Sequence, residues 1–142
     1  MTSPPSFRNP FTDLLQIEEI SIEGGAARTA IEHRPDFSNM HGAVHGGVLM
    51  ALIDTTMARA AMSRQEFRLS VVSTGISVNF TSPGFGRLVA DARVVGGGKS
   101  VCFCEAEIRD DHGHLVAKGM GTFKYRKPPS GLQAAQGPEI ID

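Results

Sequence analysis

The segment from Val48 to Met62 is the feature that most constrains the fold of this chain. It consists mainly of strong helix formers and contains neither proline nor glycine, so it predicts an uninterrupted helix. Its apolar residues cover nearly the whole circumference of that helix instead of forming one stripe. A helix of this kind is buried on most sides, so the rest of the chain is expected to wrap around it.

Asp54 is the charge that interrupts the apolar part of this helix. A buried carboxylate costs several kcal/mol unless it is paired or hydrogen-bonded. Asp54 is therefore either a structural residue with its own partners or a residue on a narrow wet face beside Thr55. The residues that open the helix add a third interpretation, a catalytic carboxylate.

Gly46 and Gly47 stand at the start of this helix, directly after His45. The first helical turn has N–H groups without an internal partner and carries partial positive charge, and glycine lets another group approach the backbone closely. This combination suits an anion or the oxyanion of an acyl-transfer intermediate, and the alternative is a flexible turn without chemistry. Gly46 and Asp54 are about 12 Å apart along one helix. If both serve one site, Asp54 must come from a second subunit whose helix is antiparallel.

The alternating pattern of β-strands occurs over residues 17–23, 26–33, 70–81, 88–95, 100–109 and 115–126. Gly24–Gly25 is a hairpin signal between the first two segments, and the four later segments are expected to be long strands joined as hairpins. From Ser70 onward, one set of residues is expected to cover the helix: Val72, Thr74, Ile76, Val78 and Phe80. No crossover helices support a parallel sheet. We therefore expect an α+β fold with one antiparallel sheet wrapped around one long central helix.

Composition and length predict a single domain over residues 1–142, with residues 1–9 and 127–142 as flexible tails. No apolar run is long enough for a membrane span and no secretory signal is present, so we expect a cytoplasmic protein that does not associate with membranes. The net charge of −1 argues against nucleic acid as a partner. Cys102 and Cys104 are expected to be small core residues, because cysteines two apart rarely form a good disulfide. His112 and His114 lack a third ligand nearby, so we expect no metal site and no cofactor.

The pattern N-x-x-G-x-x-H-G-G, from Asn39 through Gly42 to His45, Gly46 and Gly47, is followed by Asp54 nine residues after the histidine. This pattern resembles the hotdog-fold acyl-CoA thioesterases, and in particular the branch that includes the phenylacetate-pathway thioesterases. The similarity extends over about residues 13–126 and includes the segments 73–83 and 98–107. It implies a hotdog fold, hydrolysis of an acyl-CoA thioester to a free acid and coenzyme A, and a homodimer that is often doubled into a homotetramer.

The resemblance also assigns roles at the start and middle of the helix. In this family an amide at the helix start polarises the thioester carbonyl, and that amide belongs here to Gly46 or Gly47, with Gly46 preferred. Asp54 corresponds to the family's acidic residue, which acts as nucleophile or as general base on water. The sequence leaves these two mechanisms open.

Five further residues have assigned roles, each with a structural alternative. Asn39 corresponds to the residue that orients the carboxylate or the attacking water, or it makes only a local turn bond. His45 acts near the leaving sulfur, or it caps the loop. Ser73, with Thr74 as its substitute, helps to place the water, or it is an ordinary strand residue. Lys99 is expected to bind the phosphates of coenzyme A, the alternative being a solvated strand charge.

Other functions compete with thioester hydrolysis. Hotdog folds also carry hydratase and dehydratase chemistry, although the match of Asn39, His45 and Asp54 to those relatives is poorer. A non-catalytic acyl-CoA-binding module would leave Asp54 without a purpose. A serine hydrolase is disfavoured, because the chain has no G-x-S-x-G sequence.

Overall fold

The structure is a computed structural model that describes residues 9–128, so most of the two predicted tails, residues 1–8 and 129–142, lies outside the described part. The elements in chain order are α1 (Pro10–Leu14), β1 (Glu18–Glu23), β2 (Ala26–Glu32), η2 (Pro35–Phe37), α2 (Gly46–Arg64), β3 (Ser70–Phe80), β4 (Arg87–Gly97), β5 (Val101–Arg109) and β6 (Leu115–Arg126). Asn9 caps α1, since its side chain accepts a hydrogen bond from the Thr12 amide.

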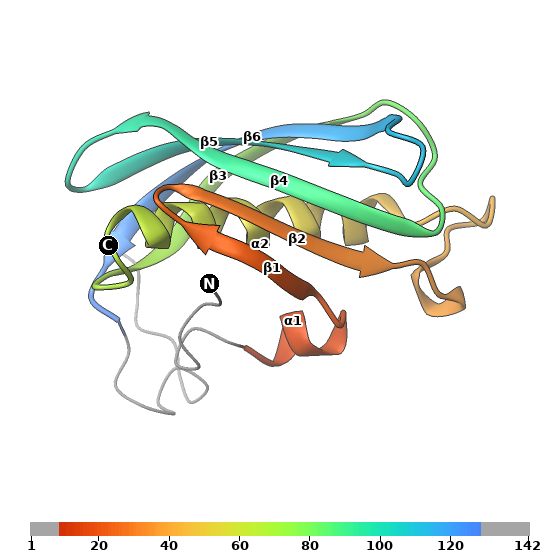
Figure 1. Ribbon diagram of the computed structural model, residues 1–142, viewed down its shortest axis with the longest axis horizontal. Helices are drawn as coiled ribbons and strands as arrows, with labels where there is room; N and C mark the ends of the chain where they lie inside the picture. The colour runs from red at the N-terminus through yellow and green to blue at the C-terminus, as the bar shows by residue number, and fades with distance from the viewer. Residues whose placement is uncertain (1–8, 129–142) are drawn as a thin grey trace.

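The six strands form one antiparallel sheet that curves over α2, with β1 and β2 in front of the helix in the view of Figure 1. The core lies between the inner face of this sheet and the buried sides of α2. This arrangement confirms the predicted α+β hotdog fold. No helix within residues 9–128 is long and apolar enough to cross a membrane.

The strand order is β1-β2-β4-β5-β6-β3, which corrects the prediction that all four long strands are joined as hairpins. The hairpins β4–β5 and β5–β6 are present, but β3 pairs with β6 and β4 pairs with β2. The segment between β3 and β4 crosses the end of the sheet instead of making a tight turn. Consequently β3 is an edge strand, and one side of its backbone is unpaired within residues 9–128.

The register of β3 shifts between Ser73 and Gly75, so Thr74 is an extra residue in this strand. After the bulge, Ile76 and Val78 pack against the core as predicted. Before the bulge the alternation is reversed, so Val71 packs against the core and Ser73 reaches α2. The prediction that Val72 and Thr74 cover the helix is therefore wrong, because period-two alternation holds only in an unbroken strand.

Two glycines on β6 set the distance between the sheet and α2. A Cβ on Gly121 would lie 2.8 Å from the Met57 Cε atom, and a Cβ on Gly119 would lie 3.0 Å from the Ile53 Cγ2 atom. A side chain at either position would therefore require the α2 side chains of Met57 or Ile53 to shift. The buried, unpaired thiols of Cys102 and Cys104 fill a neighbouring part of the core, as predicted.

The charge buried most deeply in α2 is Arg59, which the sequence analysis did not single out. Its Nε atom donates to the Glu19 carboxylate on β1 at 3.1 Å, and the two side chains are only 6% and 16% exposed. On the same side of the helix, the hydroxyls of Thr56 and Thr29 lie 2.7 Å apart. These polar contacts fix the rotation of α2 about its own axis relative to β1 and β2.

Replacing Glu19 by Ala should lower the free energy of unfolding by about 3–5 kcal/mol, because it leaves the buried Arg59 guanidinium without its carboxylate. The matched control is Glu18→Ala, which removes a neighbouring but exposed carboxylate and should cost about 1 kcal/mol or less. Urea unfolding of both variants at equal protein concentration measures the difference. Equal losses of the free energy of unfolding in the two variants would show that the buried Arg59–Glu19 pair stabilises the fold no more than an exposed ion pair does.

Candidate functional site

The segment before α2 is a closed loop held by backbone hydrogen bonds. Ser38 and Val44 form an antiparallel bridge, and the His45 amide donates to the Phe37 carbonyl at 2.7 Å. Inside the loop, Asn39 Oδ1 accepts from the His41 amide at 2.8 Å and from the Ala43 amide at 3.2 Å. These are the local turn bonds expected if Asn39 has only a structural role. They leave its Nδ2 group without a partner within residues 9–128.

His45 is the N-cap of α2. Its Nδ1 atom accepts from the Gly47 amide at 2.8 Å, and its carbonyl accepts from the amides of Val48 and Leu49. A ring nitrogen that accepts carries no proton, so in the neutral ring the proton lies on Nε2. The amides of Gly47, Val48 and Leu49 thus all have acceptors. The Gly46 amide, in the same first turn of α2, has none within residues 9–128.

The two glycines at this helix start differ in what surrounds them. A Cβ on Gly47 would lie 3.1 Å from His45 Nδ1, so a side chain at this position would require the capping ring to shift. A Cβ on Gly46 would meet only the Phe80 ring, at an ordinary contact distance of 3.4 Å. The fold of the single chain thus does not require glycine at position 46, where the free amide is.

Asp54 lies in the middle of α2, partly buried, with Ser73 of β3 opposite it. The Ser73 hydroxyl donates to Asp54 Oδ1 at 2.6 Å. Burial raises the pKa of the Asp54 carboxyl above its ordinary value, and the hydrogen bond from Ser73 offsets part of that rise. A carboxylate with a raised pKa is a stronger base than an ordinary aspartate.

Within one chain these residues form two separate groups. Asn39, His45, Gly46 and Gly47 lie at the start of α2, whereas Asp54 and Ser73 lie two turns further along. The separation of about 12 Å expected for an ideal helix applies, because α2 is continuous from Gly46 to Arg64. A single chain therefore does not bring the free amide and the carboxylate together.

Two candidate residues lie away from both groups. Thr74 is the bulge residue, and its hydroxyl donates to the Thr122 carbonyl instead of approaching Asp54. Lys99 is exposed in the β4–β5 turn, next to the last residue of α2, since Arg64 donates to the Gly98 carbonyl. Lys99 is thus at the opposite end of the helix from Gly46 of its own chain.

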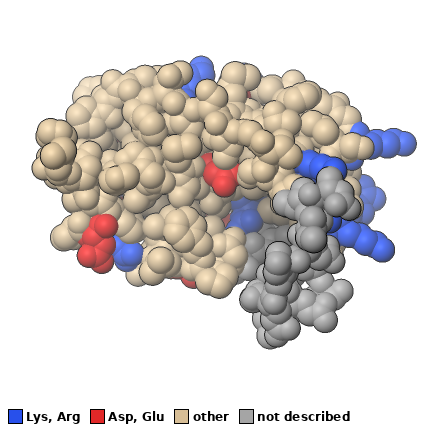
Figure 2. All heavy atoms as spheres, turned by 180° about the vertical axis from the view of Figure 1, so that it is seen from behind, with Lys and Arg blue, Asp and Glu red and all other residues tan. Residues whose placement is uncertain are grey.

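Met50, which was not among the candidate residues, lies between the two groups. Gly46, Met50 and Asp54 follow one another at four-residue intervals, so they share one stripe of α2. Met50 is 40% exposed, in contrast to the buried Leu49, Leu52 and Ile53 on the other sides of the helix. Figure 2 shows the side of the molecule opposite β1 and β2, where few charged side chains surround an acidic group near the centre.

Other polar clusters supply no alternative centre. Residues 9–128 contain no group of three or more His, Cys, Asp or Glu side chains arranged to hold a metal ion. His112 and His114 are exposed in the β5–β6 turn, beside Asp110. Burial, and then the neighbouring Cys102, raises the pKa of the Cys104 thiol, which disfavours a thiolate nucleophile.

Comparison with known proteins finds similar sequences. A family model described as "Thioesterase superfamily" matches residues 41–117, the region from the loop before α2 to β6. The acyl-coenzyme A thioesterase PaaI of Escherichia coli (strain K12) is 32% identical over 105 residues, covering 72% of this chain and 73% of that protein.

Solved structures show the same architecture. A conserved protein from Pseudomonas aeruginosa has a TM-score of 0.83 at 28% identity, with 88% of this chain and 100% of that chain covered. The E. coli PaaI protein from the phenylacetic acid degradation operon has a TM-score of 0.76 at 29% identity, with coverage of 87% and 86%.

Proposed function

The chain belongs to the thioesterase superfamily, and from this membership and the site geometry we propose that it hydrolyses an acyl-CoA thioester to a free acid and coenzyme A. The observation that carries the proposal is that one helix has both a helix-start amide at Gly46 with no acceptor within residues 9–128 and a base of raised pKa at Asp54. The PaaI relative is named as an acyl-coenzyme A thioesterase, which fits this chemistry.

In the proposed reaction the thioester oxygen accepts a hydrogen bond from the Gly46 amide, which stabilises negative charge on that oxygen in the transition state. Asp54 either takes a proton from the attacking water or attacks the carbonyl itself. In the first route the C–S bond breaks and the proton taken up by Asp54 passes to the departing sulfur, so the free acid and the coenzyme A thiol leave. In the second route C–S cleavage leaves an anhydride between Asp54 and the acyl group, which water hydrolyses to the free acid, and that water also supplies the proton that the coenzyme A thiolate takes up. Ser73 holds the Asp54 carboxylate in place.

The proposed site is shared by two subunits. A second copy of α2, antiparallel to the first, would place its Asp54 and Ser73 beside Gly46, Asn39 and His45 of the first chain. Residue 50 lies midway between residues 46 and 54, so in such a dimer Met50 would meet its own copy on the two-fold axis. The exposed apolar Met50 side chain and the sparsely charged face in Figure 2 support this arrangement. The family resemblance also suggests a tetramer made of two such dimers.

The direct test is steady-state thiol release from a panel of aryl and fatty acyl-CoAs. Thiol release with formation of the acid supports hydrolysis. Loss of an enoyl-CoA without thiol release would instead indicate a hydratase, the runner-up function. Tight binding of acyl-CoA without turnover would indicate a binding module, and either result would overturn the proposal.

Lys99 is the residue we expect to contact the coenzyme A phosphates. It is exposed and makes no ion pair within residues 9–128. In the antiparallel dimer, the turn that carries Lys99 would extend beyond the helix start of the other subunit. Lys99→Ala should raise KM at low salt about two- to five-fold, the effect of removing one exposed charge pair.

Lys118→Ala is the matched control for this prediction, because it removes an exposed lysine that already pairs with Glu107. Added salt should reduce the difference between wild type and Lys99→Ala by screening. An unchanged KM at low salt would remove Lys99 from the binding site.

A further inference from the structure

Phe80, the last residue of β3, lies against the start of α2. Its Cζ and Cε1 atoms are 3.4 and 3.5 Å from the position that a Cβ on Gly46 would occupy. The ring is nevertheless 50% exposed, so about half of its surface is not covered by the chain itself. An apolar ring thus lies beside the Gly46 backbone, whose amide has no acceptor in the described part of the chain.

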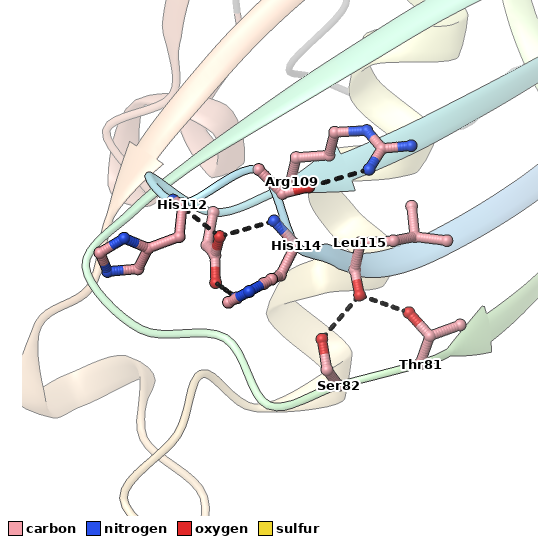
Figure 3. A network of polar contacts seen from close by, with 8 residues as sticks. Thr81, Ser82, Arg109, His112, His114 and Leu115 are labelled. Carbon is pink, nitrogen blue, oxygen red and sulfur yellow. Dashed lines mark hydrogen bonds and ion pairs between the residues drawn. The ribbon is translucent and has the colours of Figure 1, made fainter.

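The end of β3 is held firmly, which fixes the position of Phe80. The amides of Thr81 and Ser82 both donate to the Val116 carbonyl, at 2.8 and 3.3 Å. Their hydroxyls both donate to the Leu115 carbonyl at 2.6 Å, as Figure 3 shows. Phe80 itself pairs with Ala117 on β6. These contacts fix the backbone of Phe80 beside the start of α2.

The two chain segments that meet at the ring contain no lysine or arginine. Residues 42–51 and 77–84, which include the helix start and the end of β3, have neither Lys nor Arg. When the thioester carbonyl occupies the Gly46 amide, a carboxylate brought to this position would lose water without gaining a cationic partner from these two segments, which is costly. An apolar group there would gain contact with the ring.

We propose that Phe80 is a specificity-determining residue, which favours acyl groups whose first carbons beyond the thioester carbonyl are apolar and disfavours those with a carboxylate near that carbonyl. The inference rests on the proposed function, because it takes the carbonyl oxygen to be bound by the Gly46 amide. The first acyl carbons are only a few bonds from the carbonyl carbon, so they then lie close to the Phe80 ring.

The experiment compares kcat/KM for pentanoyl-CoA and succinyl-CoA, two acyl groups of similar length, on wild type, Phe80→Ala and Phe80→Leu. The ratio of the two values is independent of the fraction of correctly folded enzyme. Wild type should prefer pentanoyl-CoA. Phe80→Ala should lower this preference about tenfold, and Phe80→Leu should retain most of it, because leucine keeps an apolar side chain at the site.

Phe85→Ala is the matched control, since Phe85 is similarly exposed but packs against His33 instead of the helix start. The preference should be unchanged in this variant. An unchanged preference in Phe80→Ala, or an equal loss in Phe85→Ala, would overturn the role of Phe80.

A binding measurement separates this inference from the proposed function. Calorimetry with non-hydrolysable pentanoyl and succinyl thioethers of coenzyme A should show the same change of preference in Phe80→Ala. If wild type releases thiol from no thioester, hydrolysis is refuted, and the binding preference still decides the role of Phe80. If wild type is active but neither preference changes, Phe80 alone is refuted.

Discussion

Replacing Asp54 by Asn is expected to lower kcat by about 10²- to 10⁴-fold while leaving the protein folded, the usual loss when a catalytic acid–base group is removed. The Asn side chain can still accept the hydrogen bond from Ser73, so the local packing of α2 on β3 is kept. Steady-state thiol release and circular dichroism measure the two effects. Asp91→Asn, which changes an exposed carboxylate on β4, is the control and should keep full activity. A near-native kcat in Asp54→Asn would exclude Asp54 from the reaction.

The pH dependence should follow from the raised pKa of Asp54. A base must be ionised to act, so kcat/KM of wild type should fall as the pH drops through this raised pKa. The same group makes the folded protein bind a proton more readily than the unfolded chain does. Its contribution to the free energy of unfolding therefore decreases as the pH rises from the ordinary to the raised pKa. Asp54→Asn lacks this decrease and should be at least as stable as wild type at neutral pH.

Two inactive variants should restore activity when their subunits are mixed, if each site takes Gly46 from one chain and Asp54 from the other. Gly46→Pro removes the amide donor at the first helical position, where proline is tolerated. The preceding residue, His45, already has φ −59° and ψ 139°, the conformation that a residue before proline adopts. Mixing Gly46→Pro with Asp54→Ala under conditions of subunit exchange should recover about a quarter of wild-type activity, because half of the dimers are mixed and each has one complete site.

Cross-linking supplies an independent check of the same dimer. Met50→Cys should be joined to its own copy by a short thiol-reactive cross-linker, since residue 50 lies on the proposed axis. Ala58→Cys is on the same stripe but about 24 Å from its copy along the helix axis, so it should not react. The native cysteines are buried and give little background. In the complementation experiment, a verified mixed dimer of Gly46→Pro and Asp54→Ala that has no activity would contradict the shared site, provided that both parent variants fold and dimerise.

Much of the fold was predictable from local patterns. The buried helix followed from apolar residues on all its sides, and the hairpins β1–β2, β4–β5 and β5–β6 followed from glycines or polar turns between alternating segments. The partner of β3 was not predictable in this way. Pairing between β3 and β6 joins segments that are distant in the sequence, and no pattern in either segment identifies the other as its partner.

The candidate site shows the same limit. The sequence drew attention to Gly46 and Asp54, because glycines at a helix start and a charge in an apolar helix are local anomalies. Arg59 was missed, although it stands in the same helix, because its partner Glu19 is on a distant strand. Phe80 was expected to cover the helix, but its position at the free amide depends on how β3 ends.

The bulge at Thr74 has a consequence for insertions and deletions in β3. The extra residue is what allows Ser73 and Ile76, which have opposite parity, to face α2 in the same strand. Deleting Thr74 would restore a regular strand and leave both side chains facing inward. Deleting Val72 or Val78 would instead move the side chains of part of the strand to the opposite face of the sheet. The length of β3 is thus tolerant of change at Thr74 and intolerant on either side of it.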